Sequence, residues 1–253
     1  MILIKKIIKT FFLIFGLKIS RINKKEKIIS KKVIKKESFL NGHVEAPFNS
    51  LPFAGEAFKK FVTDFNFQTV LDIGSGEGKH SDMLRSFDKQ VTSIDFGKSI
   101  YFEKRSENHT CVFGDYYTYN FENSFDAIWA SHVLEHQPNP NLFLKKIHND
   151  LKEGGVLAIT VPPLKHDIVG GHVTLWNAGL LMYQLILAGF DCKEVSIKSY
   201  GYNISVILKK KSITSYPDLS YDSGDIIKLA NYFPKEITEP FNGDIKELNW
   251  ICV

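Results

Sequence analysis

Three glycines at alternate positions, directly after an apolar segment, constrain the fold of this chain more than any other feature. Residues 70–73 are apolar except for Asp72, which is typical of a parallel strand that is buried on both faces. Glycine has no Cβ atom, so the backbone that follows can turn tightly and approach a ligand closely. Residues 70–80 therefore predict a strand, a sharp turn and the start of a helix. The three glycines are Gly74, Gly76 and Gly78.

The glycine spacing separates the known classes of nucleotide-binding turn. A dinucleotide-binding turn needs G-x-G-x-x-G, whereas this chain has G-x-G-x-G. A P-loop ends in Gly-Lys-Ser or Gly-Lys-Thr, but His80 follows Lys79 here. The full pattern, D-x-G-x-G-x-G from Asp72 to Gly78, resembles the first motif of the class I S-adenosylmethionine-dependent methyltransferases.

The resemblance implies a binding site for S-adenosylmethionine, with S-adenosylhomocysteine as the product. In that family, an acid after the second strand holds the ribose hydroxyls, and Asp95 lies 21 residues beyond Gly74. Asp115 matches the acid near the adenine amino group. The cofactor-binding residues that the resemblance implies are Asp72, Gly74, Ser75, Gly76, Gly78, Asp95, Phe96, Gly114, Asp115 and Ser131.

The order of the remaining segments continues the family pattern over residues 60–210. Strands are expected at 125–130, 155–162, 192–200 and 202–209, and helices at 139–151 and 175–187. We therefore predict an α/β fold, a doubly wound, mostly parallel, seven-stranded sheet with helices on both faces. We divide the chain into a basic amphipathic segment (1–36), an aromatic arm (37–66), the methyltransferase domain (67–210) and a C-terminal extension (211–253).

Candidate catalytic residues lie in the loops after the fourth and fifth strands, because ligands bind beyond the carboxyl ends of the strands in such sheets. Both loops contain histidine, which suits removal of a proton from a hydroxyl acceptor. We predict His136, His172 and His132 as catalytic residues. A capping role for His136 and a pocket-lining role for His132 are the structural alternatives, and His166 and Asp167 are expected on the loop surface.

A metal site is a further alternative in the same region. His132, Glu135, His136 and the distant His172 resemble the Glu-x-x-Glu-His arrangement of metal-dependent RNA 3′-end methyltransferases, with histidine in place of the first glutamate. Residues at i, i+3 and i+4 share one face of a helix. Helices with such spacing usually serve packing and capping, so a divalent metal is an alternative that we do not expect.

Charge is distributed unevenly along the chain. Residues 1–36 contain twelve Lys or Arg and one acid, whereas the remainder has 27 acids and 20 bases. The apolar stretch in residues 10–17 is too short to span a bilayer, and no signal-peptide cleavage site follows it. Two interpretations stay open: residues 1–20 form a helix that lies on anionic lipid, or a helix that packs on the domain or serves a homodimer.

The acceptor depends on regions outside the cofactor motifs, with residues 41–52 and 170–176 as the candidate contacts. We expect O-methylation of a small polar molecule, a sugar or nucleotide-linked sugar of bacterial capsule polysaccharide synthesis. The alternatives are a quinone or lipid methyltransferase at the inner membrane face and a non-catalytic cofactor-binding subunit. Only three arginines are present, so a nucleic-acid substrate is not expected. Three widely spaced cysteines favour a cytoplasmic protein.

Overall fold

The computed structural model describes residues 42–250 of the chain. The predictions for the basic segment 1–36, including membrane contact or dimer formation through residues 1–20, lie outside the described residues, as do residues 37–41 of the arm. Within residues 42–250, no helix is both long enough and apolar enough to cross a bilayer.

One mixed sheet organises the described chain. The strand order is β3-β2-β1-β4-β5-β7-β6-β8. The five strands from β3 to β5 run parallel, whereas β7 is antiparallel to both β5 and β6, and β8 is antiparallel to β6. The strands are β1 (Thr69–Ile73), β2 (Gln90–Asp95), β3 (Val112–Phe113), β4 (Phe125–Ser131), β5 (Leu151–Val161), β6 (Ser196–Tyr200), β7 (Asn203–Lys209) and β8 (Glu247–Leu248).

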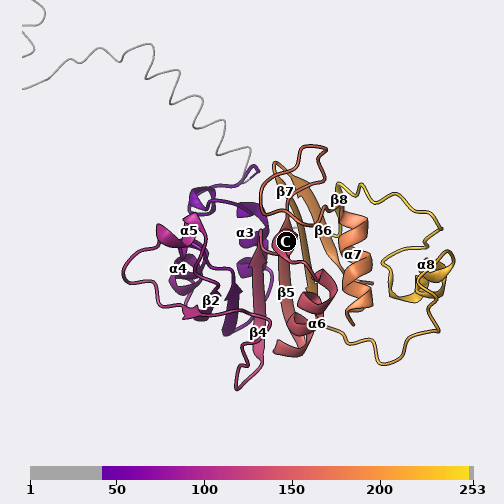
Figure 1. Ribbon diagram of the computed structural model, residues 1–253, viewed down its shortest axis with the longest axis horizontal. Coiled ribbons are helices and arrows are strands. Elements are labelled where there is room, and N and C mark those ends of the chain that lie inside the picture. The colour runs from indigo at the N-terminus through magenta and orange to yellow at the C-terminus, as the bar shows by residue number, and fades with distance from the viewer. Residues whose placement is uncertain (1–41, 251–253) are drawn as a thin grey trace, which may run out of the picture. The chain divides into compact units, whose positions relative to one another are not determined.

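Helices cover both faces of the sheet (Figure 1), as the alternation of strands and helices predicts. Helices α3, α4 and α5 lie on one side, and α6 and α7 lie on the other. The α-helices are α3 (Gly55–Thr63), α4 (Lys79–Ser86), α5 (Ile100–Glu103), α6 (Pro140–Asp150), α7 (Ala178–Leu187) and α8 (Asp225–Lys228), and the 3₁₀ turns are η1 (Phe48–Ser50), η2 (Leu134–His136) and η3 (Ala230–Tyr232).

Strand β4 shows why the core has two halves. Ile128 and Ala130 pack into the cluster under α6 and α7, while Ala127 and Trp129 pack into the cluster under α3. Successive side chains of a strand point to opposite faces, so a strand covered on both sides needs a continuous apolar run. The buried Trp129 ring lies 5.2 Å from the ring of Phe58 on α3.

The structure differs from the predicted elements in detail. The sheet has eight strands rather than seven, because β8 of the C-terminal extension pairs with β6 over two residues. A two-residue strand carries no periodicity that a sequence could reveal. The last helix expected at 175–187 begins at Ala178, since the Asn177 side chain accepts a hydrogen bond from Leu180 N and caps it.

Candidate functional site

The glycine loop joins β1 to α4 with a backbone that favours glycine at each of the three positions. Gly74, Gly76 and Gly78 have φ values of 71°, 51° and 85°. A Cβ atom on Gly74 would lie 2.4 Å from a methyl group of Val133, and one on Gly78 would lie 2.6 Å from the His109 ring. The loop therefore packs directly against the segment that follows β4.

Asp95 ends β2 beside this loop. Its Oδ2 accepts a hydrogen bond of 2.9 Å from Gly76 N, and its Oδ1 accepts one of 2.7 Å from Gly97 N. Each carboxylate oxygen has a second lone pair, so Asp95 can still accept bonds from a pair of ligand hydroxyls. The carboxylate thus links the glycine loop to the end of β2, where the sequence predicts the ribose to bind.

An aromatic rim surrounds the same end of β2 and β3. Phe96, Tyr101 and Phe113 are all at least half exposed, although large aromatic side chains usually bury more of their surface. The Phe102 ring packs edge-to-face against the Phe113 ring, with 4.7 Å between the ring centroids. An exposed apolar rim beside a carboxylate that can accept bonds from hydroxyls fits a nucleoside, with the flat base against the aromatic rings.

Asp72 occupies a different environment from Asp95. Its carboxylate is buried and accepts a hydrogen bond of 2.5 Å from Ser81 Oγ, which is itself 2.7 Å from Ser93 Oγ. Burial raises the pKa of Asp72 to about 7, and the charge of Asp95 contributes to the rise. Asp72 therefore links β1, α4 and β2 within the core. Direct contact of Asp72 with the cofactor stays a prediction, and the burial of the carboxylate does not favour it.

Of four further residues named from the sequence, three make local hydrogen bonds and one does not. Ser75 Oγ lies 3.0 Å from His109 Nε2, and Gly114 N donates to the Asp95 carbonyl. Asp115 is exposed and accepts a hydrogen bond from Tyr117 N. The Ser131 hydroxyl is buried and has no hydrogen-bond partner among residues 42–250. Their contact with cofactor, like that of Phe96, stays a prediction.

The turn after β4 gathers the chemistry-bearing side chains. His132 has a φ of 55°, a strained value for a residue with a side chain, and η2 follows at once. This tight turn brings Glu135, which is fully buried, to 3.3 Å from His132 Nδ1 and 3.8 Å from His136 Nε2. His132 Nε2 lies 3.0 Å from Asn203 Oδ1 on β7, which orients the ring from the other side.

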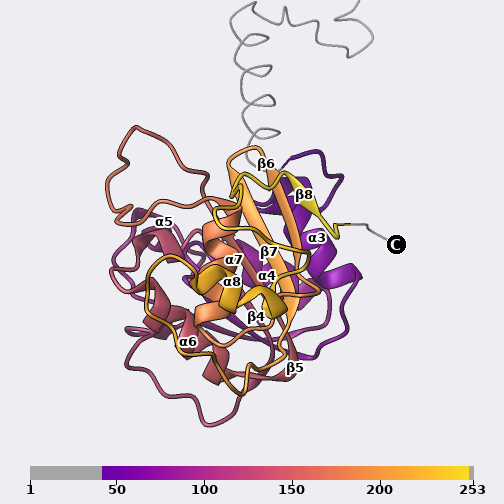
Figure 2. The ribbon, with the colours of Figure 1, turned by 90° about the vertical axis from the view of Figure 1, so that its right-hand side faces the viewer.

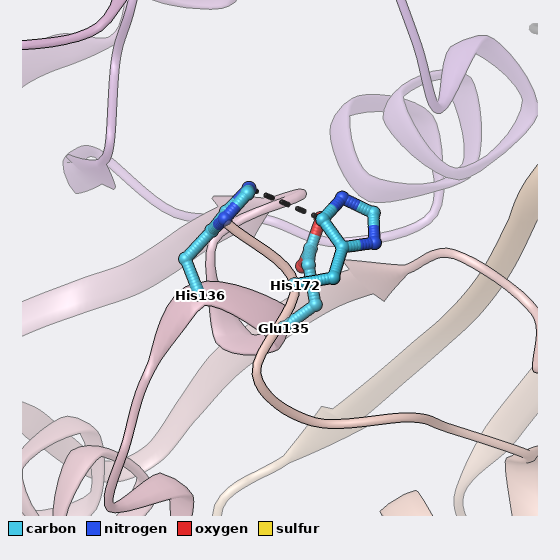
Figure 3. Close-up of side chains that lie close together, drawn as sticks. All are labelled: Glu135, His136 and His172. Carbon is cyan, nitrogen blue, oxygen red and sulfur yellow. Dashed lines mark ion pairs between the residues drawn. The ribbon is translucent and has the colours of Figure 1, made fainter. Parts of the chain in front are cut away.

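The loop after β5 brings His172 to the same place. Its two ends meet in a bridge between Pro163 and Trp176, and Val173 N donates a hydrogen bond of 2.9 Å to the Glu135 carbonyl. The His136 and His172 rings lie 4.9 Å apart (Figure 3). Burial lowers the pKa of His172, and the neighbouring His136 and His132 rings lower it further, against the Glu135 carboxylate. A neutral His172 ring can accept a proton.

The part of the aromatic arm that precedes α3 closes one side of this cluster. The ring of Phe53 lies 4.4 Å from that of His132, and the Phe53 carbonyl lies 3.0 Å from His80 Nε2 at the start of α4. Burial lowers the pKa of His80 to about 4, so the ring is neutral and donates its one proton to that carbonyl. By contrast, Phe48 and Phe58 of the arm belong to the core.

The structure thus brings His132, His136 and His172 together, as the sequence predicts for residues from two loops. His166 and Asp167 are exposed on the loop after β5. Two members of the cluster are absent from the predicted catalytic residues. Glu135 stands at i+3 from His132, and this spacing singled it out only as part of the alternative metal site. Asn203 comes from β7, and no local sequence pattern links it to the cluster.

Residues 71–159 match a sequence family described as a methyltransferase domain. A ubiquinone biosynthesis O-methyltransferase from Glaesserella parasuis serovar 5 (strain SH0165) is 32% identical over 198 residues, 73% of this chain and 77% of that protein. A protein of the same name from Xanthomonas axonopodis pv. citri (strain 306) is 32% identical over 101 residues, and the chain spans only 41% of its length.

A solved structure agrees with the fold alone. A protein from Pyrococcus horikoshii OT3 superposes with a TM-score of 0.52 over 71% of this chain and 99% of that one, at 17% identity. The glycine loop, Asp95 and the aromatic rim fit S-adenosylmethionine, which is the cofactor of this fold family. The motif order, the sheet and the O-methyltransferase relatives together show that the chain belongs to the class I S-adenosylmethionine-dependent methyltransferases.

Proposed function

We propose that this protein transfers a methyl group to a phenolic hydroxyl of an apolar, quinone-type acceptor. The relative that matches most of the chain is named for ubiquinone biosynthesis, which supports the quinone alternative rather than a sugar acceptor. Neither relative reported above is named for a sugar acceptor or for capsule polysaccharide synthesis. The acceptor is therefore proposed as an aromatic ring that carries adjacent oxygens.

The observation that carries the proposal is an apolar loop beside the histidine cluster. The loop after β5 stands out from the sheet (Figure 2). It carries His172 and exposes five large apolar side chains. A soluble protein rarely exposes so many apolar groups in one short segment unless they meet a ligand, a membrane or a partner. A sugar would need polar groups here, whereas an isoprenoid chain needs apolar ones. The side chains are Leu164, Ile168, Val169, Val173 and Leu175.

Cofactor and acceptor would meet between the glycine loop and the turn after β4, which are in contact through Gly74 and Val133. When bound, S-adenosylmethionine supplies an electrophilic methyl group on a sulfonium. The Asp95 carboxylate and the aromatic rim orient the nucleoside end, and the cluster around Glu135 orients the acceptor hydroxyl. Correct alignment of two reactants alone supplies about 7–11 kcal/mol of the barrier reduction.

Proton removal completes the proposed chemistry. The acceptor oxygen forms a bond to the methyl carbon, the carbon–sulfur bond breaks, and the hydroxyl proton leaves to an imidazole of the cluster. His136 is suited to this role, because its Nδ1 is 2.8 Å from the Gly171 carbonyl and its side chain is 43% exposed. The Nδ1 must donate to that carbonyl, which leaves the Nε2 lone pair free to accept a proton.

A panel of acceptors tests the proposal. Purified full-length protein is incubated with S-adenosylmethionine and, separately, with a prenylated catechol, an unprenylated catechol and a nucleotide-linked sugar. Mass spectrometry should show one added methyl group on the prenylated catechol, with lower kcat/KM for the unprenylated one, because the apolar loop loses its contact. Methylation of the sugar alone would refute the proposed acceptor.

A further inference from the structure

We propose that His109 is a positioning residue for cofactor binding, which holds the glycine loop, through Ser75, in the conformation that receives S-adenosylmethionine. His109 belongs to the segment between α5 and β3, and only 7% of its surface is exposed. The inference rests on the proposed function only for the place of the cofactor at the glycine loop, and it is independent of the acceptor.

One imidazole ring contacts the glycine loop at two points. His109 Nε2 lies 3.0 Å from the hydroxyl of Ser75, the residue directly after the first glycine. The ring also packs against Gly78, the last glycine, so closely that a Cβ atom there would lie 2.6 Å from it. Ser75 is itself buried. Removal of the ring would therefore leave the hydroxyl without this partner and open a space beside Gly78.

The hydrogen bonds around Ser75 form a chain with one direction. Cys111 Sγ lies 3.3 Å from the Val112 carbonyl, which can only accept, so the thiol donates its proton there. Ser75 Oγ, 3.4 Å from the same sulfur, then donates to Cys111 and accepts from His109 Nε2. The chain therefore requires a neutral imidazole ring with its proton on Nε2, while Nδ1 keeps a lone pair.

The environment of the second ring nitrogen explains why the ring must stay neutral. His109 Nδ1 is buried and has no hydrogen-bond partner among residues 42–250. A proton on Nδ1 would bring a charged N–H group into the packed space beside Gly78 without an acceptor, which is unfavourable. A protonated His109 must therefore leave this position, and Ser75 then loses its donor.

Charged groups on neighbouring elements act on the same ring. Burial lowers the pKa of His109 most, and the cations Arg85 on α4 and Arg105 after α5 lower it further. Asp82 on α4 and Asp95 at the end of β2 act in the opposite direction, but the pKa stays below the ordinary value of 6.5. The ring is thus neutral at pH 7, and cofactor binding should weaken as the pH falls through the lowered pKa of His109.

The size of the effect follows from the population of the binding conformation. A ligand that binds only one of two conformations shows an affinity reduced by the fraction of protein in that conformation. Below the pKa of His109, the affinity for S-adenosylhomocysteine should therefore fall by up to about tenfold for each pH unit. His109→Ala removes the contact at every pH and should lower the affinity at pH 8 by roughly threefold to tenfold, the range expected for one hydrogen bond.

Calorimetry with S-adenosylhomocysteine on the full chain, at pH intervals between 5 and 8, tests the inference. His109→Gln keeps an amide donor for Ser75 but cannot titrate. We expect it to bind nearly as the wild type does at pH 8 and to lose less affinity than the wild type towards pH 5. All other titrating groups, including Asp72, are common to the two proteins.

His148→Gln is the matched control. Burial also lowers the pKa of His148, but this residue lies near the end of α6 and contacts Ser212 instead of the glycine loop. The control variant should show the same pH dependence of S-adenosylhomocysteine binding as the wild type.

Equal pH dependence of His109→Gln and the wild type would overturn the inference, as would wild-type affinity of His109→Ala at pH 8. A wild type whose affinity does not change between pH 5 and 8 would overturn it as well, so the test does not depend on the folding of a variant. If the wild type binds S-adenosylhomocysteine in these experiments, the positioning role fails alone and the proposed function stands. Absence of binding by the wild type would refute both.

Discussion

Replacement of the buried Asp72 by asparagine should change how stability depends on pH. Asp72 has a pKa of about 7 in the folded chain because burial disfavours its charged form, whereas the ordinary value is 3.8. Between these two values, the folded chain holds a proton that the unfolded chain releases. The contribution of Asp72 is therefore fully favourable below pH 3.8 and is lost as the pH rises through 7.

The magnitude follows from the separation of the two values. A difference of about three pKa units corresponds to about 4 kcal/mol, at 1.36 kcal/mol for each unit. In Asp72→Asn no carboxylate can ionise, while the amide oxygen can still accept the hydrogen bond from Ser81. The variant should therefore gain about 4 kcal/mol relative to the wild type as the pH rises from 4 to 8, whatever their difference at pH 4.

Urea unfolding followed by circular dichroism, at pH intervals between 4 and 8, measures both free energies of unfolding. The difference between variant and wild type isolates Asp72 from all groups that the two proteins share. Asp167→Asn removes an exposed carboxylate and controls for the change in net charge. If the difference in free energy of unfolding between Asp72→Asn and the wild type does not change with pH, the reasoning is refuted. A carboxyl with a raised pKa must change its protonation state over this pH range.

Three further changes test other parts of the site. Asp95→Asn weakens two charge-assisted hydrogen bonds from Gly76 N and Gly97 N and should lower S-adenosylhomocysteine affinity by about tenfold or more in calorimetry; unchanged affinity would contradict this. Gly78→Ala places a Cβ against His109 at a φ of 85° and should cost at least about 1–2 kcal/mol in urea unfolding; a fully stable variant would argue against the loop geometry. Ile168→Ser with Val169→Ser should raise KM for a prenylated catechol but not for the unprenylated one, and equal effects on both would argue against apolar recognition by this loop.

The parts of the fold that could be predicted depend on local pattern. The glycine loop and the alternation of strands and helices follow from spacing, and the structure confirms both around Gly74 and Asp95. The side chain of Asp72 could not be placed in this way. Its burial results from Ser81 and Ser93, which close over it from α4 and β2.

The histidine cluster shows the same limit. His132 and His136 lie close together in the sequence, and the resemblance to known methyltransferases placed His172 near them. The partners that set the tautomers are an amide on β7 and the carbonyl of Gly171. Such partners can be identified only in the tertiary structure. The same holds for the position of Glu135 among the histidines.

A crystal structure with S-adenosylhomocysteine tests the central claim most directly, namely that the glycine loop presents the methyl donor to the cluster around Glu135. The account predicts the ribose hydroxyls on Asp95, the adenine against the rim of Phe96 and Phe113, and the sulfur atom facing the turn at residues 131–136. A ligand bound with its sulfur turned away from that turn, or bound elsewhere in the chain, would contradict it.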